Sequence, residues 1–171
     1  AEYTFALLLA VTRKVVVAHQ SVENGEFNPE GLTGVDLNGK TLGIIGVGAI
    51  GQNVAKIAKS FGMKVLGVDK NKDCKQIKYV DLETCLKESD FVTLHVPATP
   101  ETFHMINKKN IKLMKPGSFL INTARGAVVE TEAIIWALNK GILAGAGLDV
   151  TEEEILVESM SVVMSKKIKK D

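Results

Sequence analysis

Residues 41–51 have the sequence TLGIIGVGAIG, a short apolar run that leads directly into a glycine-rich turn. The run at 41–45 is typical of a buried strand in a parallel sheet. Residues 49–61 then carry apolar side chains at the spacing of an amphipathic helix, and Gly62 follows where a glycine often ends one. We therefore predict a strand, a tight turn and a helix, which together make the first unit of an α/β sheet.

The glycines of this turn, Gly46, Gly48 and Gly51, have the GxGxxG spacing of a dinucleotide-binding turn. Gly46 permits the tight turn, Gly48 lets the backbone approach a pyrophosphate, and Gly51 lets helix and strand pack closely. The pyrophosphate would meet free N–H groups at the positive end of the helix dipole. The alternative is a tight strand-to-helix turn that holds no ligand.

Asp69 follows the second apolar run, residues 64–68, at the position where a nucleotide-binding sheet needs an acidic residue. A carboxylate at the tip of that strand can accept both ribose hydroxyls of the adenosine half of NAD. It would also repel a 2′-phosphate, so we expect NAD to be preferred over NADP.

Strands and helices continue to alternate along the chain. Apolar runs predict strands at 91–96, 118–122 and 144–150, and periodic segments predict helices at 107–114 and 131–140, with a short helix after Asp81. The ends are expected to be a mostly apolar helix at 1–20, followed by a loop at 21–40, and a tail helix at 151–171. This order predicts one domain, an α/β fold with a three-layer, doubly wound parallel sheet whose core is 41–150.

The composition excludes several classes of protein. The chain has 171 residues, 21 basic against 20 acidic, so no basic field exists to hold nucleic acid. The longest apolar run, Phe5 to Val11, is too short to cross a membrane. Only Cys74 and Cys85 occur, which indicates a cytoplasmic protein with reduced thiols rather than a disulfide scaffold. No metal site is expected.

Two charged residues follow predicted strands, at the edge where α/β sheets bind ligands. Arg125 comes just after the strand at 118–122, and its guanidinium suits a substrate carboxylate. Its alternative is a surface ion pair. Asp149 could accept a hydrogen bond from the nicotinamide amide or a ribose hydroxyl, and its alternative is a turn or helix cap.

The sequence resembles the NAD-binding domain of the D-isomer-specific 2-hydroxyacid dehydrogenases from residue 1 to about residue 154. The motifs that carry the resemblance are the glycine-rich turn with Asp69, LHVP at 94–97, MKPGSFLINTARG at 114–126 and GLDV at 147–150. The opening AEYT resembles the family's interdomain helix, whose threonine, Thr4 here, lies near the nicotinamide. The resemblance implies an NAD-binding Rossmann fold and hydride transfer between NAD(H) and a small D-2-hydroxy acid or 2-keto acid.

The resemblance also implies roles for individual residues. Arg125 would bind the substrate carboxylate and polarise its keto group. Glu154 would hold the catalytic histidine and raise its pKa, whereas without the resemblance it would be interpreted as a solvated surface charge. The first helix would contribute to a homodimer interface. The implied cofactor contacts are Ala49, Ile50, Asp69, Val96, Pro97, Thr102, Thr123, Ala124 and Asp149, together with Thr4.

The sequence departs from the family in two ways. Thr151 stands where the family usually has an aromatic residue. The family's catalytic histidine lies in a Pro-His-Ile motif after a further strand, and none of His19, His95 and His104 follows Glu154. We also expect this chain to lack the substrate-binding domain, which the family assembles from both chain ends. We therefore expect this chain to bind NAD with little or no turnover.

Two other functions are alternatives for this sequence. One is a non-catalytic NAD-binding sensor or corepressor-like module of the same family, although Arg125 and Glu154 together favour an enzyme. The other is a methyltransferase that uses S-adenosylmethionine, which Asp69 and the Asn-Thr-Ala-Arg-Gly run at 122–126 argue against.

Overall fold

The computed structural model describes residues 1–26, 29–152 and 162–165. A seven-stranded sheet with the order β3-β2-β1-β4-β5-β6-β7 forms the centre of the molecule. The strands are β1 (Thr41–Ile45), β2 (Lys64–Val68), β3 (Lys78–Tyr79), β4 (Phe91–Leu94), β5 (Ser118–Asn122), β6 (Leu143–Leu148) and β7 (Val162–Ser165). The first six run parallel, which confirms the doubly wound α/β fold, and β7 pairs antiparallel with β6.

The chain begins the sheet in its middle. It passes outward from β1 to β2 and β3, then returns to place β4 on the other side of β1. The ends of these strands stay level, because Ile45 pairs with Val68 on one side and with Leu94 on the other. Ligands of open α/β sheets bind at such a switch point, beyond the carboxyl ends of the strands.

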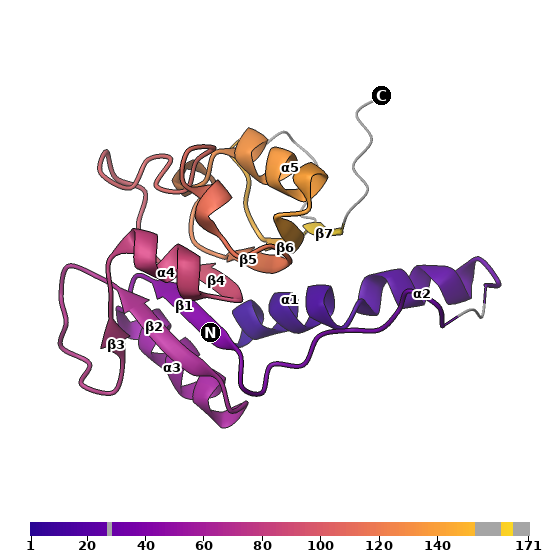
Figure 1. Ribbon diagram of the computed structural model, residues 1–171, viewed down its shortest axis with the longest axis horizontal. Helices are drawn as coiled ribbons and strands as arrows, with labels where there is room; N and C mark the ends of the chain where they lie inside the picture. The colour runs from indigo at the N-terminus through magenta and orange to yellow at the C-terminus, as the bar shows by residue number, and fades with distance from the viewer. Residues whose placement is uncertain (27–28, 153–161, 166–171) are drawn as a thin grey trace.

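Helices cover both faces of the sheet (Figure 1). The α-helices are α1 (Glu2–Thr12), α2 (Val15–Glu23), α3 (Ala49–Ser60), α4 (Leu82–Glu88) and α5 (Thr131–Lys140). Helices α1 and α3 share a core with alternate strand residues such as Leu42 and Ile44, whereas Ile45 belongs to the core that contains α5. The parallel strands are therefore apolar on both faces, which explains their continuous apolar sequence.

The N-terminal segment forms two helices instead of the single helix expected at 1–20. Lys14, at the start of α2, has a left-handed backbone conformation with φ 55°, and α1 and α2 meet at a bend of 57°. Helix α1 is packed into the core through residues such as Phe5 and Leu8, whereas α2 buries none of its residues. Among the described residues, no single helix is long and apolar enough to cross a membrane; this bent pair could do so by length and composition only.

The expectation of one tail helix over 151–171 is wrong for residues 162–165, which form β7. Leu148 of β6 pairs with Val162, so β7 satisfies backbone groups that would otherwise be exposed at the edge of the sheet. The β-branched residues Val162 and Val163 also favour an extended chain. Residues 153–161 and 166–171 lie outside the described residues.

The helix expected at 107–114 is reduced to a single 3₁₀ turn, Ile111–Leu113. The side chains of Asn107 and Asn110 explain this, because their amides donate to the backbone oxygens of His104 and Met105. Such local bonds compete with the helical pattern. The other short turn of this kind, Gly126–Val128, follows Arg125.

His95, the residue after β4, is a half-buried titratable group beside the glycine-rich turn. Its Nε2 lies 3.1 Å from Thr93 Oγ1, and burial lowers the pKa of its imidazole to about 4. At neutral pH the ring is therefore uncharged. This leaves His95 suited to packing beneath the site and unsuited to donating a proton to a substrate.

We expect His95 to make the fold sensitive to mild acid. Its pKa is about 6.5 in the unfolded chain and about 4 in the fold, so between these values the unfolded state binds the proton first. Stability should fall by about 3 kcal/mol as the pH drops from 6.5 to 4. Urea unfolding at several pH values measures this.

The His95→Gln variant should lose most of the slope above pH 5, where carboxylates contribute little. The matched control is His19→Gln, because His19 lies exposed on α2 and should leave the slope unchanged. An equally steep loss in His95→Gln would assign the sensitivity to another group.

Candidate functional site

The predicted binding residues gather at the carboxyl edge of the sheet. The glycine-rich turn follows β1, Asp69 follows β2, Val96 and Pro97 follow β4, and Thr123 to Arg125 follow β5. Asp149 comes directly after β6. Because these strands are parallel and in register, their ends lie side by side along one rim.

Two of the three turn glycines are required by close packing. Gly46 has φ +93°, and a Cβ there would lie 2.5 Å from the carbonyl oxygen of His95. A Cβ at Gly51 would lie 2.1 Å from the carbonyl oxygen of Gly46. These contacts hold the start of α3 tightly against the end of β1, as the spacing predicts.

Gly48 differs from the other two glycines. It has φ −71°, a value open to other residues, and a Cβ there would meet no atom within 4 Å. Gly48 also occupies the N-cap position of α3, and because glycine has no side chain it cannot cap this end of the helix itself. Open space in front of an uncapped helix N-terminus fits a pyrophosphate that accepts from the N–H groups of Ala49 and Ile50.

Asp69 has a structural role that its sequence position does not indicate. Its Oδ2 accepts a hydrogen bond of 2.6 Å from Val47 N in the glycine-rich turn, and its Oδ1 accepts one of 2.8 Å from Asn71 N. The carboxylate therefore ties the end of β2 to the turn after β1. Each oxygen keeps a lone pair, so the group can still accept from ribose hydroxyls.

The turn after β5 is held by Asn122, a buried residue without an assigned role in the sequence prediction. Its Oδ1 accepts from Ala124 N at 3.0 Å, and its Nδ2 donates to the Arg125 carbonyl oxygen at 3.1 Å. Its own carbonyl oxygen accepts from Asp149 N at 3.0 Å. Asn122 thus places both the turn and Asp149 at the same end of the rim.

Thr4 joins this group from the N-terminal helix. It is buried, and its Oγ1 lies 3.1 Å from Thr123 Oγ1. The structure therefore brings together residues more than one hundred positions apart, which the resemblance implied to lie near the nicotinamide.

The loop after β4 closes on itself through Thr102. The Thr102 hydroxyl donates to the Pro97 carbonyl oxygen at 2.6 Å and accepts from Thr99 N at 2.8 Å. Val96 lies against the glycine-rich turn, since a Cβ at Gly46 would come 2.9 Å from its Cγ1. Thr102 shapes the loop that would cover the adenosine.

Arg125 lies exposed at the rim. Its Nη1 donates to the Ala124 carbonyl oxygen at 2.7 Å, and it forms no ion pair with any residue that the structure describes. The guanidinium keeps most of its donors available, as a carboxylate-binding residue needs.

The chain after β6 packs onto the turn that carries Arg125. A Cβ at Gly126 would lie 2.0 Å from the Thr151 carbonyl oxygen, so only glycine permits this approach. Glu152 accepts from Thr131 N at 2.6 Å, at the start of α5, and pairs with His104 Nε2. Burial would raise the pKa of Glu152, but hydrogen bonds from Thr131 and His104 hold it below the usual value.

This contact reaches residue 152, and Glu154 lies outside the described residues. Sequence reasoning gave Glu152 no role. Only its place in an acidic run, shared with two neighbouring glutamates, could have drawn attention to it. Within the described residues, no group of three or more His, Cys, Asp or Glu could hold a metal ion.

Comparison with known proteins places this geometry in a family. The model of the D-isomer specific 2-hydroxyacid dehydrogenase NAD binding domain matches residues 5–168. The glyoxylate reductase of Thermococcus litoralis is 53% identical over 166 residues, which is 90% of this chain and 50% of that protein. The chain thus spans about half the length of the curated relatives it matches.

Comparison with solved structures leads to the same family. The D-lactate dehydrogenase of Aquifex aeolicus, in complex with NAD and lactic acid, superposes with a TM-score of 0.83 at 46% identity and covers 90% of this chain and 47% of its own. The apo D-lactate dehydrogenase of Escherichia coli gives 0.85 at 37% identity, covering 90% and 50%. The chain belongs to the D-isomer-specific 2-hydroxyacid dehydrogenase family, and residues 5–168 are its NAD-binding domain.

Proposed function

We propose that this chain is the cofactor-binding part of an enzyme that transfers hydride between NAD(H) and a small D-2-hydroxy acid or 2-keto acid. The observation that carries the proposal is the contrast within the glycine-rich turn. Gly46 and Gly51 are closed in by backbone, whereas Gly48 faces open space at an uncapped helix end. A turn that served packing alone would have no need of a glycine at position 48.

Different residues of the rim bind different parts of the cofactor. The N–H groups of Ala49 and Ile50 receive the pyrophosphate, and Asp69 receives the adenosine ribose, whose base lies beside Val96, Pro97 and the loop shaped by Thr102. When bound, the nicotinamide supplies the hydride that reduces a keto group.

The residues that take part in the reaction lie at the nicotinamide end of the rim. Thr4, Thr123, Ala124 and Asp149 surround the nicotinamide side. Arg125 binds the substrate carboxylate with two N–H donors and so turns the keto carbon toward that end. Glu154 holds the catalytic histidine in its charged form.

The protein is proposed to be a homodimer of the cytoplasm. Both cysteines are free, which suits a reducing compartment. Helix α2 extends from the body of the molecule (Figure 1) and exposes valines, of which Val15 and Val22 are 55% and 56% exposed. Apolar side chains on such an arm are typical of a subunit interface.

A pair of glycine variants tests the cofactor site. Gly51→Ala places a Cβ against the Gly46 carbonyl and should cost about 3 kcal/mol of stability. Gly48→Ala should keep stability within about 1 kcal/mol. Because its Cβ occupies the pyrophosphate position, it should nevertheless lose about 3 kcal/mol of NADH binding, roughly 100-fold in Kd. NADH fluorescence titration measures this, and unchanged binding in Gly48→Ala would contradict the site.

The role of Asp69 is tested with Asp69→Asn, because Asp69→Ala would also remove the hydrogen-bond acceptor of Val47 N. The asparagine keeps one acceptor and loses the charge, so NADH affinity should fall about tenfold. NADPH should lose less or gain, since the repulsion of the 2′-phosphate is removed. Equal losses for both cofactors would show that Asp69 does not set the preference.

Turnover is tested directly with purified protein, NADH and either glyoxylate or pyruvate. We expect NADH to bind while the rate stays far below the ordinary enzyme value of about 10 s⁻¹, because none of the chain's three histidines follows Glu154. A rate near that value would refute the expectation. NADH binding that Arg125→Gln leaves unchanged would be consistent with a role for Arg125 at the substrate.

The dimer is tested by sedimentation of the protein and of Val15→Glu/Val22→Glu. We expect a dimer that the double variant converts to monomer without weakening NADH binding. A wild-type protein that sediments only as a monomer would exclude this part of the proposal.

A further inference from the structure

The loops after β4, β5 and β6 contact one another in a closed network, which we call the three-loop network. The loop after β4 reaches the turn after β5 through His104 N, which donates to the Ala127 carbonyl oxygen at 2.9 Å. The chain after β6 reaches the same turn at Gly126, where a Cβ would lie 2.0 Å from the Thr151 carbonyl oxygen. Glu152 closes the network, because its Oε1 pairs with His104 Nε2. Two of these links are made by backbone, and the third is made by side chains.

Glu152 is held at both of its carboxylate oxygens. Its Oε2 accepts from Thr131 N at 2.6 Å, at the N-terminal end of α5, where the helix dipole favours a negative charge. Burial raises the pKa of Glu152, but hydrogen bonds from Thr131 and His104 outweigh burial and hold that pKa below its usual value. The carboxylate is therefore charged at neutral pH and can only accept, so the proton of its contact with His104 is on Nε2.

His104 has a backbone conformation that only its surroundings can maintain. Its φ is 47°, in the left-handed region that residues other than glycine rarely adopt. Residues held in this way cluster at functional sites. Asn107 Nδ2 donates to the His104 carbonyl oxygen at 2.9 Å, and the imidazole stacks on the ring of Phe103. The imidazole is therefore fixed in its place opposite Glu152.

The three-loop network joins the two ends of the proposed cofactor site. His104 belongs to the loop that Thr102 shapes beside the proposed adenosine position. The turn after β5 carries Thr123, Ala124 and Arg125 at the proposed nicotinamide position. A ligand that spans both positions binds best when the two loops already have the correct spacing. A ligand that fills only the adenosine and pyrophosphate positions does not depend on that spacing.

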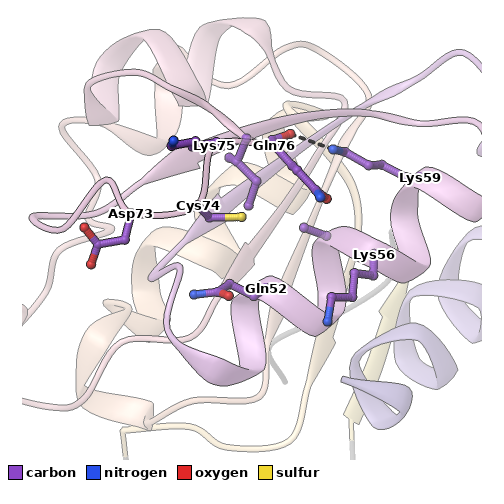
Figure 2. Close-up of a pocket in the computed structure, with 9 residues that line it drawn as sticks. Gln52, Lys56, Lys59, Asp73, Cys74, Lys75 and Gln76 are labelled. Atoms are coloured by element: carbon purple, nitrogen blue, oxygen red, sulfur yellow. Dashed lines mark hydrogen bonds between the residues drawn. The ribbon is translucent and has the colours of Figure 1, made fainter.

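The adenosine end has supports of its own. Asp69 accepts from Val47 N, and Gln52 Nε2 donates to the Val47 carbonyl oxygen at 3.2 Å. Figure 2 shows the segment that follows Asp69 across a pocket from α3, where Lys59 Nζ donates to the Gln76 carbonyl oxygen at 2.6 Å. None of these bonds belongs to the three-loop network, so opening the network should leave the adenosine end in place.

We propose that Glu152 and His104 are positioning residues, which hold the nicotinamide end of the cofactor site at the correct distance from the adenosine end. They act through the loops that they join, and neither is assigned a contact with the cofactor. The proposal rests on the proposed function and adds to it the pair of side chains that closes the three-loop network.

Glu152→Ala tests the proposal, with NADH and ADP as the ligands. We expect the Kd of NADH to rise about tenfold, the effect of losing a charged hydrogen bond. The Ki of ADP, measured by competition with NADH, should stay unchanged, because ADP fills only the adenosine and pyrophosphate positions. Glu152→Gln should restore most of the NADH binding, since its amide oxygen can accept from Thr131 N and its NH₂ can donate to His104 Nε2.

His104→Asn tests whether the two residues act as a pair, because asparagine tolerates the left-handed conformation and lacks Nε2. It should match Glu152→Ala, and the double variant should lose no more NADH affinity than either single variant. The control is Glu88→Ala, which removes an exposed carboxylate from α4 and should bind both ligands as the wild type does.

The outcomes separate this proposal from the proposed function. A wild-type protein that does not bind NADH would refute the cofactor site and the positioning role together. If the wild type binds NADH and Glu152→Ala binds it equally well, the positioning role alone is refuted. The same holds if Glu152→Ala weakens NADH and ADP in equal proportion, because the pair would then support the whole fold rather than the nicotinamide end.

Discussion

The contact between Gly51 and the carbonyl oxygen of Gly46 is the constraint on which the site depends. It brings the first turn of α3 against the end of β1, at a distance that any residue with a Cβ would prevent. Helix α3 therefore begins directly after β1, with the positive end of its dipole at the glycine-rich turn, and the space over Gly48 is open. Asp69 then fixes the turn to β2 through Val47 N, so that in the proposed site the adenosine and pyrophosphate positions would be set together.

The two cores of the sheet supply the rigidity that these contacts require. Alternate residues of each parallel strand enter opposite cores, and the strand ends stay level at the switch point between β1 and β4. Polar groups at that edge are satisfied by one another. Asn122 alone bonds to Ala124 N, Asp149 N and the Arg125 carbonyl, and it thereby holds the loops after β5 and β6 together.

Close packing and hydrogen bonds also join the rim to the part of the chain that leads toward Glu154. Gly126 admits the backbone of Thr151, and Glu152 binds both His104 and the start of α5. Three loops are thus fixed to one another beside Arg125. In the proposed enzyme this arrangement would set the distance between the carboxylate-binding Arg125 and the residues that take part in proton transfer.

The sequence determined the alternation of elements, the glycine-rich turn, Asp69 and the family, because these depend on local spacing and on residue types. Tertiary structure decided what depends on distant partners. It broke the N-terminal helix at Lys14, and it turned residues 162–165 into a strand because β6 offered an unpaired edge. It also gave Asn122 and Glu152 their places, since no local pattern records which loops will meet.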